Sequence, residues 1–339
     1  MPSIDKLNPE VPLFARTGIN LASEGLGARA VSATNEFFAP LERMLLDSRP
    51  VFYPDRFDDH GKWMDGWESQ RRRDGGHDHA VVKLAAPGRI LGFDVDTAHF
   101  TGNYAPAAMI EAASLPSGEE PDESTKWVMI LRHSALGPDA HHYLPCSSFE
   151  SWTHIRLHIY PDGGVARLKV FGVPELDATE DGQEIDLVSS LNGGRILAFS
   201  DAHYGDYMRL LAPGRGINMG DGWETRRRRE PGYDWMILAL GARGVIHKAV
   251  VDTCHFKGNF PDRCSLQAAD LSAFGDGLTD ALVTDSMFWP SLMTQQRLKA
   301  DAIHCYTDEL EVNGPVTHVR FNIYPDGGVS RLRLFGRPE

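Results

Sequence analysis

The chain has 339 residues, a formal net charge of −13 and 24% charged residues. Nucleic-acid binding needs clustered positive charge, so this acidic balance argues against a nucleic-acid partner. No apolar run approaches the roughly 18 residues of a membrane-spanning helix, so no membrane partner is expected. Residues 1–10 are polar and lack the apolar core of a signal peptide, and the four cysteines show no paired spacing. We therefore expect a cytoplasmic protein with free thiols.

Taken in chain order, the predicted elements are mostly short strands. After an N-terminal extension (1–18), residues 35–46 (NEFFAPLERMLL) form the best candidate for a short helix. Strands are expected at 80–85, 89–95 and 126–133, because these short apolar stretches are bounded by Gly, Pro or Asp.

The clearest predicted element is a β-hairpin. Ile155, Leu157 and Ile159 alternate with polar residues, which is the pattern of a half-buried strand. Pro-Asp-Gly-Gly at 161–164 then supplies a turn, in which Gly163 or Gly164 can adopt a positive φ. The pattern IYPDGGVxRLxxFG returns at the end of the chain, which indicates that the hairpin belongs to a longer repeat.

Three motifs occur twice, in the same order. The pairs are DGWESQRRR (65–73) and DGWETRRRR (221–229), VDTAHFTGN (95–103) and VDTCHFKGN (251–259), and the hairpin (159–172 and 323–336). The spacing indicates two repeats, 19–172 and 185–339, joined by a polar linker, 173–184; the second repeat carries about eight extra residues between its last two motifs. Many short strands with turn signals predict an all-β fold of two tandem jelly-roll β-sandwiches, an internal duplication.

Polar residues recur in both repeats at matched positions. The pairs are Glu68/Glu224, Arg71/Arg227, Asp96/Asp252, His99/His255, Asn103/Asn259, His142/His304 and His154/His318. Buried polar groups that satisfy loops and strand ends are the simpler explanation for any single pair. The recurrence of acids, arginines and histidines together in Gly-rich segments favours a site.

Two of these motifs carry candidate chemistry. In DGWETRRRR, arginine suits capture of a carboxylate, and Glu224 could act as an acid or base; the alternative is a solvated basic run. In DTCHFKGN, Asp252 could orient His255; the alternative is a structural histidine at a strand end.

Two patterns that suggest a metal site are incomplete. His77-x-His79 becomes Tyr233-x-Trp235 in the second repeat, and Asp94 becomes Val250. Ligand sets need complete geometry, so we expect no catalytic metal and no cofactor; a stabilising divalent ion stays open.

The three doubled motifs resemble those of the allantoicase family, and the resemblance covers nearly the whole chain, from about residue 20 to 336. It implies galactose-binding-like jelly rolls. It also implies hydrolysis of allantoate to ureidoglycolate and urea in allantoin degradation, a part of purine metabolism. One departure is that Asp234-Trp235 corresponds to Asp78-His79 in the first repeat.

Allantoate carries a carboxylate and two ureido groups on one carbon, so its cleavage needs a carboxylate clamp, amide recognition and proton transfer. We assign proton transfer to Glu224 and His255 with Asp252. The assigned substrate-binding residues are Arg227 and Asn259, with Arg71 and Asn103 as their counterparts. The second repeat is favoured because its motifs are intact, although a site at the junction stays open. We expect a homo-oligomer. The alternative function is a tandem carbohydrate-binding module without catalysis.

Overall fold

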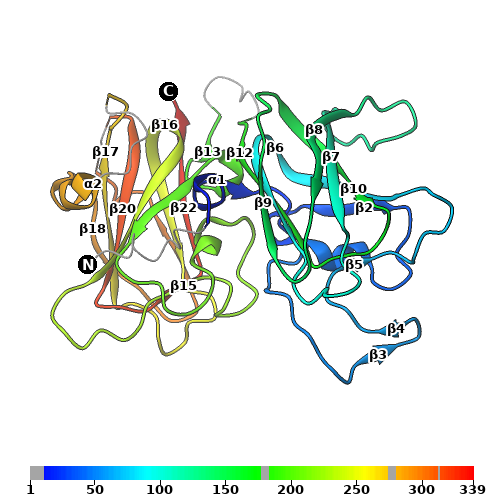
Figure 1. Cartoon of the computed structure of the whole chain (residues 1–339). Coiled ribbons are helices and arrows are strands. Elements are labelled where there is room, and N and C mark those ends of the chain that lie inside the picture. The colour runs from blue at the N-terminus through cyan, green and yellow to red at the C-terminus, as the bar shows by residue number, and fades with distance from the viewer. Residues whose placement is uncertain (1–10, 177–182, 274–279, 312–313) are drawn as a thin grey trace. The chain divides into compact units, whose positions relative to one another are not determined.

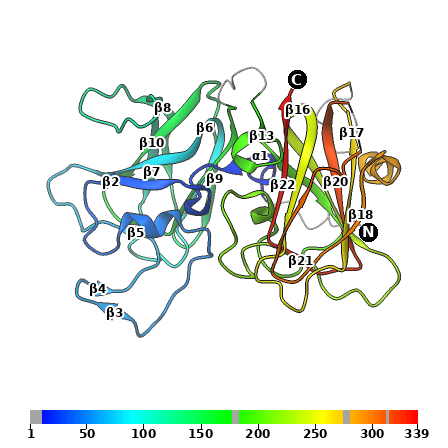
Figure 2. The same cartoon turned by 180° about the vertical axis from the view of Figure 1, so that it is seen from behind.

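The computed structural model describes residues 11–176, 183–273, 280–311 and 314–339. The chain divides into two compact units, Pro9–Glu175 (the first unit) and Leu176–Glu339 (the second unit). Figures 1 and 2 show both units, each built mainly from strands.

The described residues of the first unit, 11–175, form twelve strands and three short helices. They are α1 (Leu13–Thr17), β1 (Ile19–Asn20), η2 (Glu24–Leu26), β2 (Arg29–Ala33), η3 (Leu41–Leu45), β3 (Phe57–Asp58), β4 (Gly61–Lys62), β5 (Trp67–Glu68), β6 (Asp78–Asp96), β7 (Ala107–Ala113), β8 (Val128–Ala135), β9 (His141–Pro145), β10 (Ser151–Tyr160), β11 (Gly164–Val165) and β12 (Arg167–Pro174).

In the described part of the second unit the same strand order returns without counterparts of α1 and the β3–β4 hairpin, and with two added helices, α2 and η6. Its elements are β13 (Ile185–Asp186), η4 (Ser190–Asn192), β14 (Arg195–Phe199), η5 (Tyr207–Leu211), β15 (Trp223–Glu224), β16 (Asp234–Asp252), β17 (Arg263–Ala269), α2 (Asp280–Asp285), η6 (Ser286–Phe288), β18 (Ser291–Arg297), β19 (Ile303–Tyr306), β20 (Val316–Tyr324), β21 (Gly328–Val329) and β22 (Arg331–Pro338).

One long strand in each unit takes part in two layers. The first part of β6 pairs with β2 and β10, whereas its second part pairs with β12 and β9. The change of partners falls near Pro87 and Gly88, and proline and glycine favour a bend there. In the second unit, β16 divides in the same way between β14 and β20 on one side and β22 and β19 on the other. The prediction of two jelly-roll sandwiches is confirmed.

Each sandwich encloses its own apolar core. Ile155, Leu157 and Ile159 of β10 are fully buried, as the alternation predicted, and Trp67 of β5 is buried with them. Trp223 holds the matching place in the second core. Gly163 has φ 127°, which is the positive φ that the predicted turn requires.

Two segments differ from their prediction. Residues 35–46 contain only the one-turn helix η3, because Pro40 caps it without a side-chain hydrogen bond and five residues are too few to propagate a helix. The insertion in the second unit, expected as a loop, contains α2 and η6, which lie beside β17 and β18 in both views (Figures 1 and 2). Leu282 and Trp289 pack there against Ile237.

Candidate functional site

Two of the doubled motifs are neighbouring strands in each unit. In the first unit, β5 pairs antiparallel with β11, which sets Glu68 opposite Gly164. In the second unit, β15 pairs with β21, which sets Glu224 opposite Gly328. Because side chains alternate along a strand, the buried tryptophan before each glutamate faces the core and the glutamate faces the other way.

The third motif contributes a phenylalanine ring that packs against the glycine opposite the glutamate. A Cβ atom on Gly164 would lie 2.0 Å from a ring carbon of Phe100, and the matching distance between Gly328 and Phe256 is also 2.0 Å. Only glycine therefore fits under these rings. The Gly164 amide also donates to the Asn103 carbonyl at 2.8 Å, which fixes the start of the loop that carries Asn103.

The converging motifs make a carboxyl–amide pair in each unit. Asn103 Nδ2 donates to Glu68 Oε1 at 2.7 Å, and Asn259 Nδ2 donates to Glu224 Oε1 at 2.5 Å. Glu68 is only 7% exposed. Burial raises the pKa of Glu68 to about 7, although the hydrogen bond from Asn103 opposes that rise. A carboxyl group with this pKa can give and take protons near neutral pH.

The arginine run beside the glutamate is held at its middle residue. Arg72 donates from Nε and Nη2 to Asp78 Oδ1 at 3.2 and 3.0 Å, and its backbone amide donates to Asp162 Oδ2 at 2.7 Å. Among the residues that the structure describes, neither Arg71 nor Arg73 has a hydrogen bond or ion pair. The aspartate of the repeated PDGG turn therefore holds the run in place, and the two flanking guanidinium groups remain available for a ligand.

The same anchors return in the second unit. Arg228 Nη2 donates to Asp234 Oδ1 at 2.6 Å, and its backbone amide donates to Asp326 Oδ2 at 2.9 Å. Within the described ranges, Arg227 and Arg229 lack partners in the same way.

A pocket of about 730 Å³, here called the first pocket, lies over the Glu68–Asn103 pair. Its wall contains Phe37, Phe38, Glu68, Ser69, Gln70, Arg71, Arg72, Arg73, Gly102, Asn103, Tyr104, Pro106, Pro161, Asp162 and Gly163. This volume lies in the range of small-molecule sites. The pocket wall combines arginine side chains with Glu68, a carboxyl group whose pKa is about 7.

A pocket of about 400 Å³ in the second unit, here called the second pocket, lies beside the arginine run. Its wall contains Ser200, Asp201, Arg226, Arg227, Arg228, Arg229, Glu230 and Asp234. This wall corresponds to residues 34–35, 70–74 and 78 of the first unit, so it shares only the run itself with the first pocket. Neither Glu224 nor Asn259 belongs to that wall.

Of the residues predicted from the sequence, Arg71 and Asn103 line the first pocket and Arg227 lines the second. Asn259 contacts Glu224. The side-chain amides of Asn103 and Asn259 were expected to recognise a ureido group. In the structure their Nδ2 atoms donate hydrogen bonds to the glutamates.

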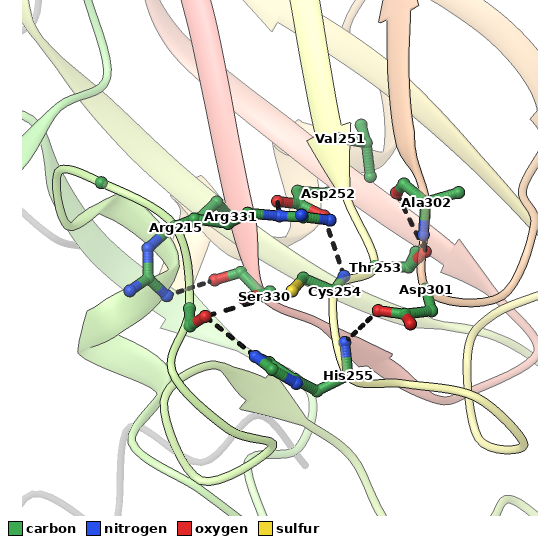
Figure 3. Close-up of polar contacts among 12 residues, drawn as sticks. Arg215, Val251, Asp252, Thr253, Cys254, His255, Asp301, Ala302, Ser330 and Arg331 are labelled. Atoms are coloured by element: carbon green, nitrogen blue, oxygen red, sulfur yellow. Dashed lines mark hydrogen bonds and ion pairs between the residues drawn. The ribbon is translucent and has the colours of Figure 1, made fainter.

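Asp252 and His255 hold the loop after β16 (Figure 3). Asp252 accepts from the backbone amide of Cys254 at 2.8 Å and from Arg215 Nε at 3.2 Å. His255 Nε2 lies 2.9 Å from the Gly216 carbonyl oxygen. The first contact fixes the loop internally and the other two tie it to residues 215–216. A part of Asp252 and His255 in proton transfer stays a prediction.

Three residues that the structure places at the candidate site were not selected as site residues from the sequence. Glu68 was noted only as the counterpart of Glu224, and Arg73 and Asp162 were not chosen. The available signal was the spacing in the arginine run: in an extended chain, the first and third arginines share a side and the second faces away.

The described part of the chain contains no group of three or more His, Cys, Asp and Glu side chains arranged to hold a metal ion. No helix among the described residues is long and apolar enough to cross a membrane. The expectation that the protein works without a cofactor stays a prediction.

Comparison with known proteins also shows the two repeats. The family model described as allantoicase repeat matches residues 19–175 and again 185–339. A probable allantoicase of Rhizobium meliloti (strain 1021) is 60% identical over 329 residues, which is 96% of each chain. A probable allantoicase 1 of Burkholderia mallei (strain ATCC 23344) is 54% identical and covers 97% of each chain. The crystal structure of allantoicase from Saccharomyces cerevisiae matches with a TM-score of 0.78 and 33% identity, over 94% of this chain and 93% of that one. The chain belongs to the allantoicase family.

Proposed function

We propose that the first pocket is where this chain hydrolyses allantoate to ureidoglycolate and urea. The reaction is that of the family, whose curated relatives are 50–60% identical over nearly the full length. A carbohydrate-binding module without catalysis is not favoured, because these relatives are named allantoicases. The single observation that supports the first pocket is that its wall contains both a buried glutamate, Glu68, with a pKa of about 7, and arginines without partners.

Arg71 and Arg73 provide the clamp for the substrate carboxylate. Guanidinium groups bind a carboxylate through paired N–H donors, and these two have no competing acceptor among the described residues. Arg72 contributes by its anchoring to Asp78 and Asp162, which orients its neighbours. Holding the carboxylate places the central carbon of allantoate above Glu68 in one orientation.

Glu68 provides the proton. The C–N bond between the central carbon and one ureido nitrogen breaks, that nitrogen takes a proton and leaves as urea, and water supplies the hydroxyl group of ureidoglycolate. Because Asn103 donates to Oε1, the second carboxyl oxygen of Glu68 is the one left to carry the transferable proton. Burial keeps a substantial fraction of Glu68 protonated near pH 7, as an acid for this step requires.

The test is urea release by Glu68→Gln, with Glu224→Gln as the matched control. We expect kcat of Glu68→Gln to fall by about 10²–10⁴, the range for removal of a general acid or base. Glu224→Gln should cost less than about tenfold, since Glu224 is only half-buried. Circular dichroism confirms that both variants fold. Near-normal kcat in Glu68→Gln together with a large loss in Glu224→Gln would move the chemistry to the second unit.

The setting of the reaction is also part of the proposal. We propose that the protein works in the cytoplasm, since its four cysteines are free, as thiols are in a reducing compartment. We also propose a homo-oligomer. Cell fractionation and sedimentation velocity test these two statements.

A further inference from the structure

The second pocket has unused ligand-binding groups that the proposed reaction does not require. Its two internal ion pairs join Arg228 to Asp234 and Arg226 to Asp201. Those aspartates are buried and already engaged. Arg227 and Arg229 therefore present free guanidinium groups at a pocket of about 400 Å³. Neighbouring cations in an otherwise acidic protein favour an external anion between them.

An acceptor stands beside these donors. Glu230 lines the second pocket and has no hydrogen bond or ion pair within the described ranges. Its counterpart in the first unit, Asp74, is paired with Arg72 Nη1 at 2.8 Å. Ser200 also lines the second pocket. A ligand that joins a carboxylate to N–H donors would satisfy the arginines and Glu230 together.

The acid used in the first unit is absent from this wall. Glu224 keeps its hydrogen bond from Asn259, but neither residue lines the second pocket. Met219 Sδ lies 3.9 Å from Asn259 Nδ2. The second pocket therefore offers groups for binding, and its carboxyl group without a partner, Glu230, is exposed rather than buried as Glu68 is.

We propose that the second pocket binds a small ureido carboxylate, the chemical class of the substrate, without cleaving it. This inference rests on the proposed function, because it takes the first pocket as the place of cleavage. Each chain would then hold one ligand molecule at a reactive site and one at a site for binding alone.

The experiment is calorimetric titration of Glu68→Gln with allantoate. The expected stoichiometry is about two molecules per chain, and it falls to about one when Arg227→Ala and Arg229→Ala are added, because the guanidinium forks are lost. The matched control adds Arg71→Ala and Arg73→Ala to Glu68→Gln and should also leave about one site, the one in the second pocket. Glu230→Gln in the Glu68→Gln background should weaken the second site several-fold, since a neutral amide accepts N–H groups less strongly than a carboxylate.

The outcomes separate the two proposals. A single site in inactive, folded Glu68→Gln that is lost with Arg71 and Arg73 would overturn the inference and leave the proposed function standing. Urea release that survives in Glu68→Gln and is abolished in Glu224→Gln would overturn both, because the second pocket would then be the reactive one.

Discussion

The two units contain the same glutamate–asparagine pair but differ in what surrounds the glutamate. The backbone amides of Phe38 and His203 donate to the Glu68 and Glu224 carbonyl oxygens at 3.2 and 3.0 Å, so they hold equivalent positions. Phe38 lines the first pocket, whereas the second unit has histidine at that place. Glu68 is buried, and Glu224 is only half-buried. A duplicated site can therefore differ in function through its wall while its hydrogen-bonded core stays the same.

The arginines provide the largest effect after the glutamate exchange already described. Arg71→Ala with Arg73→Ala should lower kcat/KM about 10²-fold or more, because two charge-assisted contacts to the substrate are lost. Arg227→Ala with Arg229→Ala should cost far less. Steady-state assays of urea release measure both variants. Equal losses in the two pairs would remove the functional difference between the pockets.

The pH dependence of the reaction should follow Glu68. As an acid with a pKa of about 7, it should give a kcat/KM that falls as pH rises above that value, by about tenfold per pH unit. This alkaline limb should be missing from the residual activity of Glu68→Gln and present in Glu224→Gln. An unchanged limb in Glu68→Gln would assign the titration to another group.

The ionisation of Glu68 should also lower the free energy of unfolding as pH rises. A carboxyl group whose pKa rises from 4.5 to about 7 on folding favours its neutral form, so its ionisation destabilises the fold as pH rises through that window. The full cost above the window is about 3 kcal/mol. Chemical denaturation should therefore show that Glu68→Gln gains stability relative to the wild type between pH 5 and pH 8. A difference that does not change with pH would contradict the raised pKa.

Removal of the Asn103 side-chain amide should shift the alkaline limb of the pH profile. Asn103 donates to Glu68 and so lowers its pKa. Asn103→Leu should raise that pKa further and shift the alkaline limb upward by about one pH unit. Asn259→Leu is the matched variant, for which a much smaller shift is expected. A downward shift in Asn103→Leu would mean that lost packing let water reach Glu68.

The smallest effect concerns the turn that positions the arginine run. Asp162→Asn keeps an acceptor for the Arg72 amide but removes its charge. KM should rise a few-fold, with kcat nearly unchanged, because a hydrogen bond to a neutral acceptor is about half as strong. Asp326→Asn makes the same change in the second unit. A kcat loss as large as the KM effect would give Asp162 a direct part in the chemistry.

The fold could be predicted because its signals are local. Alternation in β10, the PDGG turn and the doubled motifs each depend on a few adjacent residues. The helix α2 could not be predicted in the same way, because it depends on packing of Leu282 and Trp289 against Ile237, far away in sequence. Only the extra length of that segment was visible.

The residue types of the candidate site were predictable, but the distinction between the repeats was not. The sequence favoured the second repeat because its motifs were intact. The raised pKa of Glu68 depends instead on its burial at a pocket whose wall comes from segments distant along the chain, including Phe37, Phe38 and the loop with Asn103. Which unit carries the reaction stays a prediction for the matched variants to decide.

The two anchors of Arg72, one on its backbone and one on its side chain, also fix which neighbouring residues face the pocket. Its backbone and its side chain are both fixed, so the positions of the residues before and after it are counted from that point. Insertion or deletion of one residue between Glu68 and Arg72 would present the wrong arginines to the pocket, even if every letter of the motif survived. Substitution is tolerated where the frame is kept: Gln70 in the first unit is Arg226 in the second, and Asp74 is Glu230. The spacing of this segment is thus constrained more tightly than its composition.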